Sequence, residues 1–177
     1  MRIGGLALVA ILSVSVLTPA SAAMRISEDR GGQIGQYLQN FAMLRSSGER
    51  VIIDGNCLSA CTLLLGIIPR SRMCATPRAR LGFHAAWIPG ADGEPVTSRP
   101  GTRALWNNYP LSVRHWIAHH GGLSRHMIYM QGRALYAFVP SCQAVTRSAQ
   151  RHHARSRHRY ASRHLRYYSA SAANDRR

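Results

Sequence analysis

Ser59 is the residue best placed for covalent chemistry, because it lies in the first turn of a buried helix expected at 58–68, just after an apolar strand expected at residues 51–53. Gly55 is expected to turn the chain between them. At the start of a helix, backbone amides without intrahelical partners and the positive end of the dipole favour a developing oxyanion. The same place suits a serine that only caps the helix. Ser59 alone therefore leaves two interpretations open.

His84 is the candidate base, at the end of a strand expected at residues 81–84. Histidine is the usual general base near neutral pH, although a buried histidine can also be purely structural. All 23 basic side chains are arginine. The absence of lysine excludes a Schiff-base mechanism and a Ser–Lys dyad.

The order of motifs resembles the proteolytic subunit of the Clp protease and its relatives with the crotonase-type fold. A Gly-Gly pair precedes a helix, then come a strand, Gly-x-x-x-Ser, a second helix, and a strand ending in Gly-Phe-His. This resemblance implies that Ser59 is the nucleophile and that His84, about 25 residues later, is the base. It also implies that the amides of Gly32 and Ala60 form the oxyanion hole.

The sequence motif Cys-x-Ser-Ala-Cys-Thr, followed later by Leu-Gly-Phe-His, is similar to the motifs of an exported branch of this superfamily. The resemblance covers about residues 26–142. One part of the family pattern is missing, because no acid occurs between Glu94 and Asp175. Asp54, Asp92 and Glu94 do not match the family's third position. A backbone carbonyl or an amide such as Asn107 would then have to orient His84.

The pattern of elements predicts a small α/β domain with a parallel sheet and crossover helices, of the Clp-protease/crotonase kind. Strands are expected at 23–28, 51–53, 72–76 and 81–84, and a loop at 89–101. One helix is expected to begin at Gly31-Gly32, with helical spacing from 34 to 45, and to end at Ser47-Gly48. Others are expected at 58–68 and 112–120, with Ser124 capping a further short helix.

Three segments of different composition indicate a signal peptide at 1–22, a Clp-protease-like domain at 23–145 and a disordered Arg/His-rich tail at 146–177. The first has a basic start, an apolar run and a small-residue cleavage site. The predicted location is therefore the periplasm or the exterior. The four cysteines are expected to form disulfides there, in one of three pairings: Cys57, Cys61, Cys74 and Cys142.

No cofactor and no metal site is expected. The spacing of the cysteines is a poor match to structural zinc sites, and no Cys-x-x-Cys-His motif for haem occurs. His115 and His119 share a helix face but have no third ligand at a recognisable spacing. The cationic tail is expected to attract anionic envelope polymers or lipids rather than a specific nucleic acid.

Two functions follow from these features. The first is an exported Clp-like serine hydrolase, a peptidase that acts on a peptide or protein through Ser59 and His84. The second is a non-catalytic relative that serves as a binding or structural protein of the cell envelope. The retained spacing of serine and histidine favours the enzyme, and the missing acid favours the second function.

Overall fold

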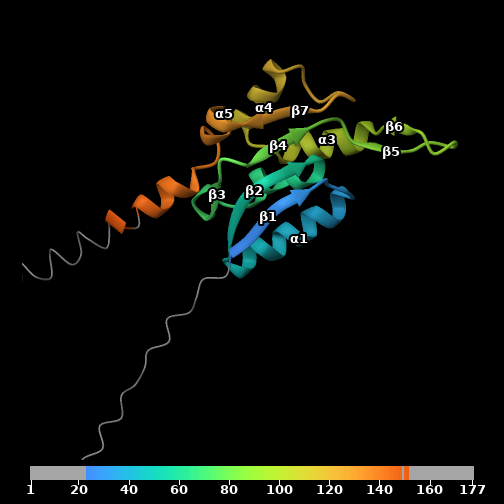
Figure 1. Ribbon diagram of the computed structural model, residues 1–177. Coiled ribbons are helices and arrows are strands. Elements are labelled where there is room, and N and C mark those ends of the chain that lie inside the picture. The colour runs from blue at the N-terminus through green and yellow to red at the C-terminus, as the bar shows by residue number, and fades with distance from the viewer. Residues whose placement is uncertain (1–22, 149, 152–177) are drawn as a thin grey trace, which may run out of the picture.

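The computed structural model describes residues 23–148, 150 and 151. They form a mixed α/β domain around a mostly parallel sheet (Figure 1). The predicted signal peptide and most of the predicted tail lie outside the described residues. Within the described part, no helix is long and apolar enough to cross a membrane.

The strand β2 (Arg50–Leu58) is the centre of the sheet. It pairs in parallel with β1 (Ala23–Asp29) on one side. On its other side, its first half pairs with β3 (Met73–Ala75) and its second half with β4 (Arg80–Phe83), both in parallel. The edge strand β7 (Ile128–Gln131) runs antiparallel to β4. The carboxyl ends of β2 and β4 therefore lie side by side, so Ser59 and His84 follow neighbouring strands.

Helices bury the apolar core against this sheet. The helix α1 (Ile34–Ser47) contacts the 3-10 helix η1 (Ser59–Leu63), α2 (Leu64–Ile67) and α3 (Arg99–Asn108). Further on come α4 (Leu111–His119) and α5 (Gly132–Tyr136). A second 3-10 helix, η2 (Arg70–Arg72), leads into β3, and β5 (Trp87–Pro89) and β6 (Pro95–Thr97) form a hairpin that projects from the domain in Figure 1.

The end of α1 is set by a local glycine and by a side chain that is distant in the sequence. Gly48 adopts a left-handed conformation, with φ of 78°, directly after the last helical residue. The guanidinium of Arg72 donates hydrogen bonds to the carbonyls of Leu44 and Arg45 at 2.7 Å each. Carbonyls in the last turn have no partner within the helix, so a distant arginine completes this cap.

Two predictions around Ser59 were wrong in detail. Gly55 does not turn the chain but remains in β2, where the register with β1 shifts and the Ser27 carbonyl approaches closely. Glycine is needed there for this close approach of two backbones. The helix predicted at 58–68 starts one residue later and divides into η1 and α2, because Leu58 still belongs to the sheet.

Two later predictions were also wrong. The loop predicted at 89–101 contains β6 and the first turn of α3, whose start is capped by Ser98 through a hydrogen bond from the Gly101 amide. Ser124 does not begin a helix. Its hydroxyl accepts a bond from the His126 amide at 3.2 Å in a turn that leads into β7. A serine that caps a turn and one that caps a helix look alike in sequence.

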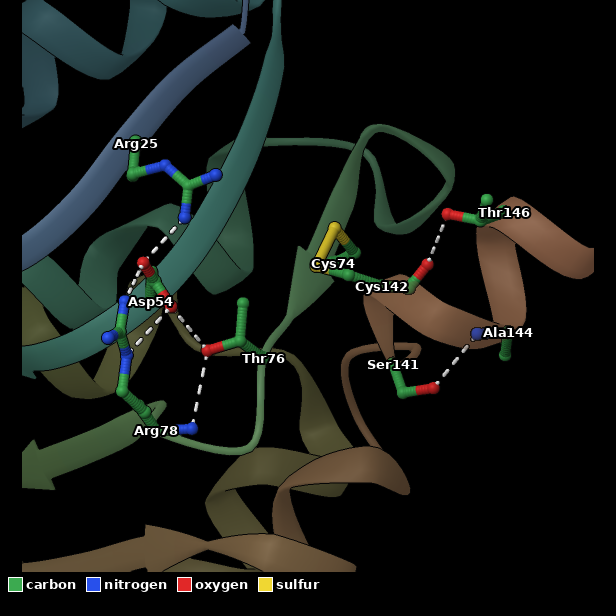
Figure 2. Close-up of a disulfide and its surroundings, with 9 residues drawn as sticks. All are labelled: Arg25, Asp54, Cys74, Thr76, Arg78, Ser141, Cys142, Ala144 and Thr146. Atoms are coloured by element: carbon green, nitrogen blue, oxygen red, sulfur yellow. Dashed lines mark hydrogen bonds and ion pairs between the residues drawn. A yellow bond between two sulfur atoms is a disulfide. The ribbon is translucent and has the colours of Figure 1, made fainter.

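The carboxylate of Asp54 lies at the centre of a polar cluster beside β2 (Figure 2). Arg25 and Arg78 each donate to its Oδ2 at 2.5 Å, and the Thr76 hydroxyl donates to Oδ1 at 2.7 Å. The bonds from Arg78 and Thr76 hold the pKa of Asp54 well below its usual range. Asp54 thus ties β1, β2 and the segment after β3 together.

We expect Asp54→Asn to lower the thermal midpoint at pH 7, with a loss that shrinks as the pH falls from 5 to 2. Because the folded-state pKa is depressed, the stabilisation is present above the unfolded pKa of about 4 and is lost as the pH falls towards the folded one. Calorimetry across this range checks it, with Asp92→Asn in the exposed hairpin as the control. A loss that is independent of pH would contradict the electrostatic explanation.

Two disulfides join the four cysteines, as Cys57–Cys61 and Cys74–Cys142. The predicted oxidation is thus confirmed, and the structure selects one of the three pairings. The second disulfide fixes the helical residues 142–148 to β3 (Figure 2). Disulfides of this kind indicate an oxidising environment.

The two disulfides are expected to stabilise the fold unequally. They close segments with sequence separations of 68 and 4 residues, and the loss of unfolded-state entropy increases with loop length. Replacing Cys74 and Cys142 with alanine should cost about 4 kcal/mol, against about 2 kcal/mol for Cys57 and Cys61, on the chain-entropy relation. Urea unfolding of both double variants measures the difference. The reverse order would show that native packing, not loop entropy, dominates.

Candidate active site

Ser59 stands in a backbone conformation that a serine rarely adopts. Its φ is 55°, and among the described residues it is the one non-glycine residue with a positive φ. Such conformations persist only where the surrounding structure enforces them, and they are found preferentially at functional sites. Here the Cys57–Cys61 disulfide joins the residues two positions before and two positions after Ser59. The tight turn from strand to helix is therefore closed covalently.

A buried pair of hydroxyls holds the same turn from inside the domain. The Thr62 hydroxyl donates to the Ser59 carbonyl at 2.6 Å and lies 2.7 Å from the Tyr109 hydroxyl. Since Thr62 has one proton to give, Tyr109 must be the donor in the second bond. Burial raises the pKa of Tyr109 to about 12, so it keeps that proton at neutral pH.

The Gly31–Gly32 loop lies directly against Ser59. A Cβ added to Gly31 would come within 2.6 Å of both the Leu58 carbonyl and the Ser59 Cβ, and the φ of Gly31 is 80°. Asp29 at the end of β1 fixes this loop, because its Oδ1 accepts from the Gly31 amide at 2.8 Å and from the Tyr37 hydroxyl at 2.5 Å. The first of these is an Asx turn. Only a glycine can occupy position 31 without displacing the serine.

His84 is half-buried directly after β4, and a backbone carbonyl orients its ring. Its Nδ1 lies 2.7 Å from the carbonyl oxygen of Ala85, whose own amide donates to the Ser124 carbonyl at 2.7 Å. A carbonyl only accepts, so Nδ1 carries the proton. In the neutral ring, Nε2 is then the unprotonated nitrogen, which is the tautomer that a general base requires.

Gly32, Ser59 and His84 line one cavity of about 590 Å³. Its walls are largely apolar, with contributions from Ile34 on α1 and Leu105 on α3. The predicted nucleophile, base and glycine amide are thus brought together from three separate elements. Among the described residues, however, no hydrogen bond links Ser59 Oγ to His84.

Ala60 occupies a different position from the other three predicted residues. It is fully buried beneath Gly31 and does not line the cavity. Its amide lies in the first turn of η1, where amides have no partner within the helix. Gly32 lines the cavity, and within the described residues its amide makes no hydrogen bond.

None of the acids considered as partners of His84 lies within hydrogen-bonding distance of its Nδ1. Nδ1 is hydrogen-bonded to the carbonyl of Ala85. The carboxylate of Asp54 accepts hydrogen bonds from the two arginines and the threonine described above. Asp92 and Glu94 lie at the exposed tip of the β5–β6 hairpin. Asn107 is exposed on α3. The sequence suggested a backbone carbonyl or the Asn107 amide as the group that orients His84, and in the structure it is a backbone carbonyl.

The cysteines and histidines form no metal site in the described part of the chain. No three His, Cys, Asp or Glu side chains gather there, and the four cysteines are all paired. His115 and His119 are exposed on α4. The tail predicted to bind anionic polymers lies, apart from its first residues, outside the described residues.

Sequence reasoning missed the side chains that position the site: Asp29, Tyr37, Thr62 and Tyr109. A signal existed for Asp29, because Asp-Arg-Gly at a strand end is typical of an Asx turn. Thr62 and Tyr109 are 47 residues apart, and no local pattern connects them.

The fold and the site define a class, a small disulfide-bonded α/β domain with a serine and a histidine at the ends of adjacent parallel strands. No protein-family model and no curated protein matches the chain. The function must therefore be argued from the site.

We expect Gly31→Ala to lower both stability and any reactivity of Ser59. The new methyl group would collide with backbone at Leu58 and with Ser59 itself, and the residue would be held at a positive φ. The matched control is Gly35→Ala in α1, where a Cβ meets nothing within 4 Å and should add about 0.5–1 kcal/mol of helix stability. Thermal melts of both variants test the contrast. Equal midpoints would mean that the loop moves aside freely.

Proposed function

We propose that the protein is an exported Clp-like serine hydrolase, a peptidase, with Ser59 as nucleophile and His84 as general base. The observation that carries this proposal is the left-handed Ser59, enclosed by a disulfide and sharing a cavity with a histidine in the correct tautomer. The parallel order β1–β2–β4 also supports a Clp/crotonase-type fold. Export through residues 1–22 belongs to the same proposal, and the two disulfides support it.

In the proposed reaction, His84 Nε2 takes the proton of Ser59 Oγ as this oxygen bonds to the carbonyl carbon of a peptide. The carbonyl π electrons move to its oxygen, which the Gly32 amide stabilises. When the tetrahedral intermediate collapses, the C–N bond breaks and the departing amine takes the proton from His84. Water then hydrolyses the acyl-enzyme by the same route, which regenerates Ser59.

Two features imply that the reaction is slow. The partner of Nδ1 is a neutral carbonyl rather than a carboxylate, so the imidazolium formed during attack receives weaker stabilisation. The second proposed oxyanion donor is the amide of Ala60, a fully buried residue that does not line the cavity, so we infer that the Gly31–Gly32 loop must shift before this amide can bind an oxyanion. Substrate binding would have to supply that movement.

The second candidate is a non-catalytic envelope protein that binds or structures other components. The observation in its favour is that, within the described residues, no hydrogen bond links Ser59 Oγ to His84, while a neutral carbonyl occupies the place of the acid. In this alternative the left-handed serine is only part of a tight, disulfide-closed turn. The same experiment separates the two functions.

A fluorophosphonate probe should label Ser59 in the folded protein, slowly in comparison with enzymes that have a complete triad. His84→Ala should reduce the labelling rate by about 10³-fold or more, since the general base is lost. Mass spectrometry of the labelled peptide gives the site, and Ser59→Ala is the blank.

Asn107→Ala on the exposed face of α3 controls for non-specific effects of substitution. Circular dichroism must show that every variant is folded. If the folded protein is not labelled, or is labelled equally fast without His84, the protein belongs to the second, non-catalytic candidate.

A further inference from the structure

A second cavity, of about 690 Å³, adjoins the proposed active site. The two cavities share three wall residues, Arg30, His84 and Trp87. The two cavities are therefore adjacent, with His84 in the wall of both. The two cavities differ in the charge of their walls.

Three arginines line this second cavity, Arg30, Arg80 and Arg125, together with one carboxylate, Glu28. The apolar cavity has only Arg30 in common with this set and no acid. Because a concave surface with low-dielectric walls concentrates the field of its charges, an excess of guanidinium groups attracts an anion there. Glu28 offsets one of them, since its carboxylate lies 3.5 Å from Arg30 Nε.

Arg80 is held in place before any ligand arrives. It is half-buried, its Nε donates to Asn56 Oδ1 at 2.9 Å, and its guanidinium carbon lies 4.5 Å from the centre of the Tyr129 ring. Asn56 is itself fixed by donating to Glu28 at 2.7 Å. These contacts orient the guanidinium but engage only Nε in a hydrogen bond, so both terminal nitrogens remain to donate.

Arg125 completes the cavity from another segment, the turn between α4 and β7. It is exposed, and within the described part of the chain its side chain makes no hydrogen bond and no ion pair. An oriented guanidinium and an exposed one without a bonded partner among the described residues, on two walls of the same cavity, form a suitable clamp for a planar anion.

We propose that this cavity binds a carboxylate of the peptide substrate, so that the site selects acidic peptides. The inference rests on the proposed function for the role of the ligand, although the binding of the carboxylate does not require catalysis. The apolar cavity would take an aliphatic or aromatic side chain on one side of the scissile bond. The arginine cavity would take the carboxylate on the other side, either that of an Asp or Glu side chain or that of the peptide's own C-terminus.

Binding is measured first in the folded, full-length Ser59→Ala protein, where no acyl transfer occurs. Four fluorescent hexapeptides are identical except at one position, which is Glu or Gln, and at the C-terminus, which is free or amidated. The four combinations separate the two sources of carboxylate. We expect the preferred acidic form to bind about tenfold more tightly than its neutral counterpart, because charge-assisted bonds to arginine contribute on this scale. Added salt should weaken this preference.

Arg80→Gln and Arg125→Gln should each remove most of this preference without changing the affinity of the neutral peptide. Arg147→Gln, which removes a charge from the exposed helical residues 142–148, should keep it. Because Arg80 has structural contacts, the exposed Arg125 carries the test if the Arg80 variant does not fold. Equal affinities for acidic and neutral peptides, or a preference that survives Arg125→Gln, overturn the proposal.

Failure of the proposed function gives a different pattern. If fluorophosphonate does not label the native protein but acidic peptides still bind through Arg80 and Arg125, the hydrolase is excluded and the carboxylate site stands. If labelling occurs normally and no charge preference is found, the serine chemistry stands and the carboxylate site is excluded.

Discussion

The left-handed backbone of Ser59 is the constraint on which the rest of the site depends. A residue with a side chain at positive φ is unfavourable, so other parts of the fold must hold it. The Cys57–Cys61 disulfide closes the turn covalently, Thr62 bonds its carbonyl, and Gly31 packs directly against it. This close approach in turn requires Asp29 to fix the glycine loop. The disulfide, the glycine loop and the buried core therefore all restrain the backbone of Ser59.

The environment of His84 determines what this arrangement can do. Its ring is oriented by a neutral carbonyl, which selects the tautomer but contributes little to stabilising a positive charge. A substrate that places a carboxylate near His84 would supply some of the missing negative charge itself. The arginine-lined cavity next to the histidine is the proposed binding place for such a group.

Much of the fold was predictable because its signals are local. The strand β1, the helix α1 with its terminal Gly48 and the first part of the strand β2 follow from hydrophobic periodicity and from glycine. The errors arose where tertiary contacts override local pattern. Gly55 resembles a turn residue but lies in a strand, because a neighbouring backbone passes too close for any side chain. The β5–β6 hairpin and the start of α3 were hidden in a segment rich in Gly and Pro.

The sequence, with the resemblance that its motifs show, determined the candidate residues Ser59, His84, Gly32 and Ala60. It also determined that the chain has no lysine and no acid between Glu94 and Asp175. It also indicated that the four cysteines are oxidised, because this inference uses only their even number and the expected export to an oxidising compartment. Only the tertiary structure decided which cysteines pair, what orients His84 and where the arginines gather. These depend on contacts between residues as far apart as Cys74 and Cys142. Such contacts are set by the register of the parallel sheet, which no short stretch of sequence encodes.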